Sequence, residues 1–336
     1  MNKQHARPSR WWLIQLVASV LVLGLFIRSV EPEQLRSLPS RVHLLPLLGA
    51  LLVKGLALLL HDIRLWYILP QPRPPLIDIL RVGLVSGVVN LVSPGRAGDV
   101  LNVALLRTRC GIPLGTATAT MGLVGVLEAA AFGTLLLAGL TFGAANWEQL
   151  IGAEAHDQAF ELVGLGTGLG LLGLTAVAII GRRLAAREPE SKPDQPGAIQ
   201  VLQDAFTQTG AALASPQKIV FHVTLAYTQV LGMVFSFAVA LPAVGVSVPT
   251  PFIAAAMIMG LSAVASVVLP PGYGAGPAAA ALTVLHPLGV QEAEVLAYAG
   301  AWWVLSQLPA LVLGLPSMWS LGVRWSDTET SGDNGD

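Results

Sequence analysis

Long apolar runs separated by short polar segments dominate the pattern of this chain. Six runs approach the length of about 20 apolar residues that a helix needs to cross the hydrocarbon of a bilayer. They cover residues 11–27, 44–69, 114–140, 160–181, 218–244 and 295–320. Backbone polar groups in lipid must pair within their own segment, so each run predicts a helix. The pattern therefore predicts an all-α polytopic membrane protein with six full transmembrane helices.

Two further apolar regions are interrupted by glycine- and proline-rich turns. The region 77–112 has a short arm on each side of the turn SPGRAGD at 93–99. The region 250–289 has arms of about 20 and about 10 residues around the turn 270–277. A ten-residue helix rises only about 15 Å, half the hydrocarbon thickness. We therefore expect two re-entrant hairpins, or broken helices, that are buried in protein or line a polar cavity.

The two interrupted regions resemble each other. The matched pairs are Pro94-Gly95 with Pro271-Gly272, Gly98 with Gly276 after one inserted residue, and Gly111-Ile112 with Gly289-Val290. Chance matching among the 35 glycines of the chain is the alternative explanation. A duplication would make repeat one about 44–140 and repeat two about 218–320. Three crossings separate the two hairpins, so they would form an inverted repeat, which is typical of transporters.

Composition and charge support a membrane protein and suggest its orientation. Hydrophobic residues make up 54% of the chain and charged residues 12%, against about 25% charged in soluble domains. The loop 182–217 is basic and the loop 141–159 is acidic, so the first is predicted to be cytoplasmic and the second external. The N-terminus is basic and therefore internal, although the basic segment around Arg28, Arg36 and Arg41 then breaks the rule. We expect both termini in the cytoplasm.

The domain organisation follows from the same pattern. Residues 1–326 are expected to form a single integral membrane domain in the cytoplasmic (inner) membrane. Residues 327–336 are polar and acidic and are expected to be a disordered tail. The segment 199–214 has apolar residues at helical spacing, which favours an amphipathic helix on the cytoplasmic surface.

The two turns are the first candidate binding site. Asp99 is suited to cap a helix that begins at Val100, and Pro277 to the first position of the matching helix. Both turns would then present helix N-termini, which attract anions, toward the membrane interior. Arg96 adds a full positive charge, although a local pair with Asp99 or a position at the cytoplasmic surface is the alternative. The predicted substrate-binding residues are Pro94, Gly95, Arg96, Gly98, Asp99, Pro271, Gly272, Tyr273, Gly274 and Gly276.

This chemistry calls for an anion on an otherwise apolar molecule. A phospholipid head group or a polyprenyl phosphate fits it. The partners we expect are therefore an anionic membrane lipid and the bilayer, with no nucleic acid. A homodimer or a partner from envelope biosynthesis stays open.

A second group of polar residues lies within the apolar runs: Lys54, His61, Asp62, Arg64 and Glu128. Lys54, His61 and Asp62 fall within reach of one helix face. They could line a cavity or carry protons, or they could be charges at the membrane surface. Glu128 lies inside an apolar span and needs a basic partner or a proton, and Arg96 is the partner we expect.

Signs of catalysis and metal binding are weak. No cluster of histidine, cysteine or carboxylate residues has metal-ligand spacing, and no phosphate-binding GxxxxGK[ST] motif occurs. Ser262 in GLSA partly matches the serine motif of intramembrane proteases, and the reach of His286 is unclear. Polar residues of the 218–244 run, His222, Tyr227 and Gln229, are more typical of contacts between helices. We expect no catalytic residue, no metal and no cofactor.

At these residues the chain resembles the flippase-like family typified by the transmembrane region of lysylphosphatidylglycerol synthases. The first family signature stands here as Pro94, Arg96, Gly98 and Asp99, with aspartate where glutamate is commoner. The second stands as PPGYGAGPAAAALTVLHPLGV. Two features depart from the family. The glutamate of the second signature falls at about Pro277 or Ala278, and a common arginine is missing from 121–131.

The resemblance covers roughly residues 11–322 and implies a lipid flippase or transporter. We expect the soluble aminoacyl-transfer domain of the synthases to be absent, so the resemblance implies translocation or lipid-linked export rather than synthesis. The missing glutamate favours a second hypothesis, a non-transporting accessory protein of lipid or cell-envelope biosynthesis. A third hypothesis is an intramembrane enzyme that depends on Ser262.

Overall fold

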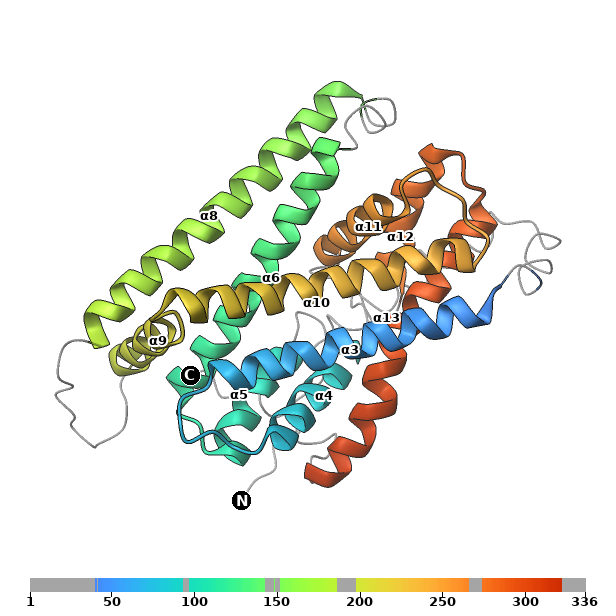
Figure 1. Cartoon of the computed structure of the whole chain (residues 1–336). Helices are drawn as coiled ribbons and strands as arrows, with labels where there is room; N and C mark the ends of the chain where they lie inside the picture. The colour runs from blue at the N-terminus through green and yellow to red at the C-terminus, as the bar shows by residue number, and fades with distance from the viewer. Residues whose placement is uncertain are drawn as a thin grey trace, which may run out of the picture. The chain divides into compact units, whose positions relative to one another are not determined.

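The computed structural model describes residues 40, 42–92, 97–142, 148, 152–185, 198–265 and 274–321. Every regular element within these ranges is a helix (Figure 1). The all-α prediction is therefore confirmed for the part of the chain that the structure describes. The predicted first helix at 11–27 and the predicted tail at 327–336 lie outside the described residues.

Five described helices are long and apolar enough to cross a membrane. They are α3 (Leu44–Ile68), α6 (Leu114–Phe142), α8 (Ala153–Ala185), α10 (Pro216–Ala243) and α13 (Glu292–Leu321). They coincide with five of the six predicted spans. The protein is thus a multi-pass membrane protein.

Four shorter helices fill the two interrupted regions. They are α4 (Leu76–Val92), α5 (Ala97–Cys110), α11 (Pro251–Ala265) and α12 (Ala275–Leu285), which continues into the 3-10 turn η3 (His286–Leu288). With 11 residues, α12 rises about 16 Å, too little to cross the hydrocarbon. Short helices at these positions agree with the prediction of broken helices, and their re-entrant course stays a prediction.

The chain divides into two compact units, which we call unit one and unit two. Unit one comprises residues 1–52, 83–102 and 235–336, and unit two comprises 53–82 and 103–234. The predicted single membrane domain stays a prediction.

In unit one the long helix α13 packs against α4 and α12. A Cβ added to Gly314 would lie 2.6 Å from the carbonyl oxygen of Leu84, and one added to Gly87 would lie 3.5 Å from Ala310. These two contacts show that α13 and the second half of α4 pack closely and run antiparallel. The helix α12 packs against α11 and α13.

In unit two α6, α8 and α9 (Ala198–Ala212) pack against one another, and α6 and α8 lie side by side in Figure 1. At the α6–α8 contact, a Cβ on Gly133 would meet Thr167 Oγ1 at 2.1 Å. The helix α9 is the one predicted from the amphipathic pattern. Its Gln208 is buried and donates a hydrogen bond of 2.7 Å to the carbonyl of Ile68, so α9 also packs into unit two.

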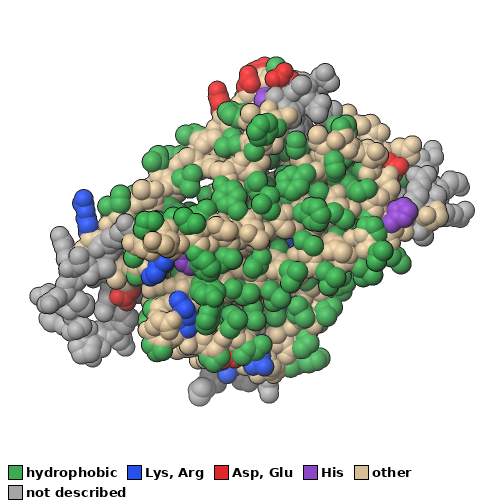
Figure 2. Space-filling view, in the orientation of Figure 1, with side chains coloured by type: hydrophobic (Ala, Val, Ile, Leu, Met, Phe, Trp, Pro, Cys, Tyr) green, Lys and Arg blue, Asp and Glu red, His purple; other side chains and the backbone are tan. Residues whose placement is uncertain are grey.

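Large apolar side chains cover much of the described surface, and Figure 2 shows them spread over the visible face. On α8 the exposed leucines are Leu162, Leu165, Leu169, Leu171 and Leu172. Such a surface would be an interaction site on a soluble protein. Here it is the surface expected to face lipid.

The helix pairs α5–α6 and α12–α13 are separated by one constant offset in residue number. Ala275 at the start of α12 lies 178 residues after Ala97 at the start of α5, and Glu292 of α13 lies 178 after Leu114 of α6. The glycine between the helices repeats the offset: Gly111 has φ 68° and Gly289 has φ 79°. The residues matched in the sequence therefore occupy equivalent places in the secondary structure, which agrees with a duplication.

Candidate functional site

The first candidate site is the start of α5 in unit one. The side chain of Asn90, on α4, accepts a hydrogen bond of 2.8 Å from the backbone N–H of Gly98 and donates one of 2.9 Å to Asp99 Oδ1. Gly98 is required here because a Cβ would lie 2.1 Å from the carbonyl oxygen of Ser86. Asn90 thus holds the beginning of α5 against α4.

This geometry corrects the predicted cap. The helix begins at Ala97, three residues before the predicted start, so Asp99 is its third residue and does not cap it. Asn90 takes up one first-turn N–H from outside the helix, and the Asp99 carboxylate lies in the same turn. Both features make this helix start less electropositive than the sequence predicted.

The start of α12 is built differently. Its N-cap is Gly274, with φ 74°, and no side chain caps it. Pro277 is the third residue of the helix rather than the first, a position that still tolerates proline because first-turn N–H groups have no partner within the helix. Ala275, Gly276, Pro277 and Ala278 are buried. No carboxylate stands in this turn, so its partial positive charge is not offset locally.

The start of α12 contacts α13 directly, and the start of α5 is held by α4, which packs on α13. A Cβ on Gly274 would contact Trp303 at 3.4 Å. The helix α4 runs antiparallel to α13 from the Gly314 contact toward lower residue numbers, and its Asn90 carries the start of α5. Unit one therefore assembles the described parts of both predicted turns, Gly98, Asp99, Gly274 and Gly276. The predicted residues Pro94, Gly95, Arg96, Pro271, Gly272 and Tyr273 lie outside the described residues.

The second candidate site is a buried polar cluster in unit two. One oxygen of Glu128, Oε1, accepts hydrogen bonds from Arg64 Nη2 at 2.5 Å and from Gln229 Nε2 at 2.8 Å. His61 Nδ1 lies 2.5 Å from the same oxygen. These side chains come from three helices that each qualify as a membrane span, α3, α6 and α10. We call these four residues the Glu128 cluster.

The Glu128 cluster gives Glu128 two basic neighbours. Glu128 pairs with Arg64 and His61, and Arg96, the partner that the sequence suggested, lies outside the described residues. The Arg64 side chain is 0% exposed, and it also donates to the carbonyl of Val124 at 3.2 Å. Its Nε and Nη1 atoms are buried without a hydrogen-bond partner in the described structure. A guanidinium in this setting depends on its carboxylate, because an unpaired buried charge is very costly.

The other predicted polar residues take different places around the cluster. Lys54 interacts electrostatically with Glu128. Asp62 is buried, and its Oδ2 makes no hydrogen bond to a described residue. His61 and Arg64 contact Glu128 directly, and the common face of Lys54, His61 and Asp62 stays a prediction.

The polar residues of α10 behave largely as contacts between helices. Gln229 donates to Glu128, and the Tyr227 hydroxyl lies 2.5 Å from Thr134 Oγ1 of α6. His222 is buried, but its Nδ1 has no hydrogen-bond partner among the described residues. The first two observations confirm the sequence interpretation, and the third leaves His222 unexplained by it.

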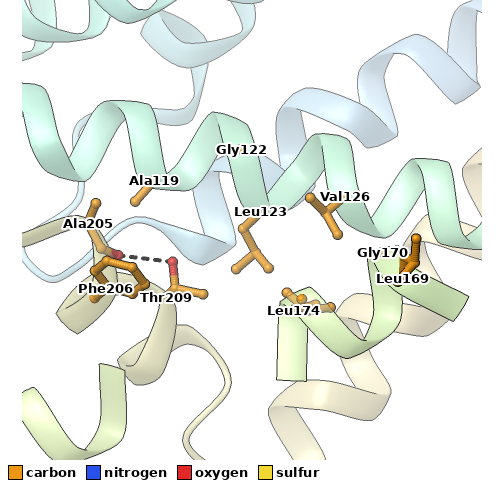
Figure 3. Close-up of a pocket in the computed structure, with 11 residues that line it drawn as sticks. Ala119, Gly122, Leu123, Val126, Leu169, Gly170, Leu174, Ala205, Phe206 and Thr209 are labelled. Carbon is orange, nitrogen blue, oxygen red and sulfur yellow. Dashed lines mark hydrogen bonds between the residues drawn. The ribbon is translucent and has the colours of Figure 1, made fainter. Parts of the chain in front are cut away.

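Unit two also contains an apolar groove of about 440 Å³. Its walls come from α6, α8 and α9 and include Gly122, Leu174 and Phe206 (Figure 3). Thr209 is the one hydroxyl on the lining, and it donates to the carbonyl of Ala205. The groove therefore presents apolar surface, which suits an acyl chain better than a head group.

Catalytic and metal-binding arrangements do not assemble in the described part of the chain. Ser262 Oγ is buried and forms no hydrogen bond there, and His286 is exposed. No group of three metal-ligand side chains comes together among the described residues. The absence of catalytic residues and of a metal stays a prediction.

Sequence reasoning missed one site residue, Asn90, and one contact, that of Arg64 with Glu128. Both depend on which helix faces meet. For Asn90 a signal was present: it is the one amide in the apolar arm before the first turn, within one helical turn of its end. For Arg64, nothing in the sequence indicated which of the basic residues would pair with Glu128.

These helices and buried ions define a multi-pass helical membrane protein with paired short helices. The chain belongs to the family of the lysylphosphatidylglycerol synthase TM region, whose family model matches residues 12–314. The resemblance stated from the two turn signatures is thereby confirmed. A search of curated proteins gives no match. The family indicates a membrane protein of lipid handling or biosynthesis.

Proposed function

We propose that this protein is a non-enzymatic lipid flippase that moves an anionic phospholipid or lipid-linked phosphate across the cytoplasmic membrane. The observation that carries the proposal is the shared offset of 178 residues between α5–α6 and α12–α13. Broken helices in corresponding positions of two repeats are typical of transporters. The family supports the lipid as the cargo.

The two sites suggest a division of labour. The head group would pass the helix starts in unit one, where α12 offers an uncapped, carboxylate-free first turn. Arg96, which lies outside the described residues, would add the full positive charge. The acyl chains would stay in the surrounding lipid. The Glu128 cluster would hold the helices of unit two together during this cycle.

The experiment is lipid translocation in proteoliposomes. Fluorescent phosphatidylglycerol would be placed in one leaflet, and its appearance in the other would be followed with a membrane-impermeant quencher. We expect Arg96→Ala to slow translocation at least tenfold. The matched control is Arg109→Ala, which removes the same charge from an exposed position on α5. Equal rates for Arg96→Ala and the unmodified protein would contradict the proposal that Arg96 binds the lipid head group.

One observation favours the second candidate, a non-transporting accessory protein. The first turn of α12 contains Pro277 and Ala278 where the family carries glutamate, and both are buried. An accessory protein would show no translocation above protein-free vesicles, and it would co-purify with a stable partner of lipid or envelope biosynthesis. The same proteoliposome measurement therefore separates the two candidates.

A further inference from the structure

A second pocket, of about 450 Å³, lies in unit two where α3 ends, α9 ends and α10 begins. Its lining includes the cations Arg73 and Lys218, the aromatic residues Tyr67 and Phe221, and the buried His222. The ends of α3 and α10 are ends of membrane spans, so the pocket belongs at a bilayer surface. It shares no lining residue with the apolar groove.

The two cations are held in place without a carboxylate. Arg73 donates from Nε to the carbonyl of Leu69 at 3.0 Å and from Nη2 to that of Tyr67 at 2.9 Å. Lys218 Nζ donates to the carbonyl of Ala211 at 3.1 Å. Neither side chain forms an ion pair within the described structure. Arg73 keeps three N–H groups and Lys218 keeps two beyond these bonds.

Aromatic contacts fix Arg73 further. Its guanidinium lies 4.9 Å from the ring centre of Trp66 and 5.5 Å from that of Tyr67. The Tyr67 ring in turn meets Phe221 edge to face at 5.0 Å. The charged end of Arg73 is thus positioned before any ligand arrives, which lowers the entropy cost of binding.

His222 supplies an independent sign of a ligand. Its side chain is 3% exposed and lines the pocket, yet Nδ1 has no hydrogen-bond partner in the described residues. A buried polar atom is normally paired. A phosphate oxygen in the pocket could pair with it when Nδ1 carries the proton. Capping of helix carbonyls is a sufficient reason for the positions of Arg73 and Lys218. It does not explain why His222 Nδ1 is buried without a partner in the described residues.

We propose that this pocket binds the phosphate of an anionic membrane lipid, with Arg73 and Lys218 as its charged ligands and His222 as its buried donor. Two cations favour a phosphate with net negative charge. Tyr67 and Phe221, each 41% exposed, would lie beside the first carbons of the acyl chains. A free phosphate ion would use the cations but not this apolar wall. The inference concerns binding alone, so it does not depend on translocation.

The test measures lipid binding to the delipidated full chain by native mass spectrometry. The probes are phosphatidylglycerol, phosphatidylcholine, which has the same phosphate but no net charge, and soluble glycerol phosphate. We expect Arg73→Gln with Lys218→Gln to weaken phosphatidylglycerol binding at least tenfold, since charge-assisted hydrogen bonds are lost. The matched control, Arg107→Gln with Arg109→Gln, removes two exposed charges from α5 and should bind normally.

A second variant keeps the proposal falsifiable if the double variant folds poorly. His222→Phe preserves the ring and removes Nδ1, and we expect it to weaken phosphatidylglycerol binding several-fold with an unchanged elution profile. Equal binding by the Arg73/Lys218 variant and the Arg107/Arg109 control would overturn the proposal. So would glycerol phosphate binding as tightly as the lipid. Because no lipid has to cross a membrane, neither result bears on translocation.

Discussion

At the scale of single residues, the Glu128 cluster concentrates three hydrogen bonds on one carboxylate oxygen. Arg64 depends most on this oxygen for a hydrogen-bond partner, because it is fully buried and two of its nitrogen atoms have no partner in the described structure. Glu128 itself is a quarter exposed. The stability of this arrangement therefore depends more on satisfying Arg64 than on shielding Glu128.

We expect Glu128→Gln to destabilise the protein by roughly 3 kcal/mol, because it leaves a buried guanidinium without its counter-ion. Thermal unfolding in detergent measures this effect. The double variant Arg64→Met with Glu128→Gln should recover part of the loss, since the uncompensated charge is gone. A double variant less stable than both single variants would contradict this account of the cluster.

Gly98 provides a second prediction at this scale. A Cβ there would lie 2.1 Å from a backbone oxygen and 2.6 Å from Asn90, so Gly98→Ala must move α5 away from α4. We expect a loss of about 1–3 kcal/mol, as for other overpacked sites. Gly125→Ala is the control, because a Cβ at Gly125 meets nothing within 4 Å. Equal unfolding temperatures for the two variants would show that α5 is not tightly held.

At the scale of helices, small residues decide where helices approach. Without a hydrophobic driving force in lipid, close packing through glycine and alanine brings helices together. The contacts of Gly87 and Gly314 between α4 and α13 are of this kind. They set the position of the short helix α4 along the long helix α13.

Gly314→Ala should therefore disturb unit one, because its Cβ would lie 2.4 Å from Val88 and 2.6 Å from the carbonyl oxygen of Leu84. We expect a loss of roughly 1–3 kcal/mol in detergent unfolding. Gly300→Ala, on the same helix, has no atom within 4 Å of the new Cβ and should be tolerated. A variant Gly314→Ala as stable as Gly300→Ala would argue against close α4–α13 packing.

The matched glycines Gly111 and Gly289 give a prediction about the duplication. Both have positive φ and open space around the Cβ position, so alanine would cost only backbone strain, about 1–2 kcal/mol. We expect similar losses at the two positions in chemical unfolding, and smaller ones for asparagine, which tolerates this conformation. Clearly unequal losses would weaken the equivalence of the two turns.

The sequence was a good guide to elements and a poor one to contacts. Apolar length predicted five described spans, and the breaks at the two turns predicted α4–α5 and α11–α12. Helix starts were displaced at Asp99 and Pro277, because Asn90 and Gly274 set the ends from outside the helix. The Glu128–Arg64 pair was missed, since it depends on the faces that α3 and α6 present to each other. Spacing along one helix cannot supply that information.

At the scale of the whole molecule, charge in the loops predicts orientation. The basic loop 182–217 and the acidic loop 141–159 flank α8. By the positive-inside rule the first faces the cytoplasm and the second the outside. The same rule places the pocket between α3 and α10 on the cytoplasmic side. This orientation is a prediction from sequence.

Cysteine labelling in intact cells tests the orientation. In a Cys110→Ala background, which removes the one native cysteine, we expect Asn146→Cys to react with a membrane-impermeant maleimide. Ser191→Cys should react only after the membrane is permeabilised. The reverse pattern would invert the predicted orientation and move the Arg73–Lys218 pocket to the outer leaflet.

The shared acceptor at Glu128 also limits how the protein can move. Sliding one helix past another by a single turn displaces it about 5.4 Å, far beyond the reach of a hydrogen bond. If the hydrogen bonds at this oxygen persist, the parts of α3, α6 and α10 that meet there move together. Under the proposed flippase function, the rearrangement that opens a path for the lipid would then hinge elsewhere.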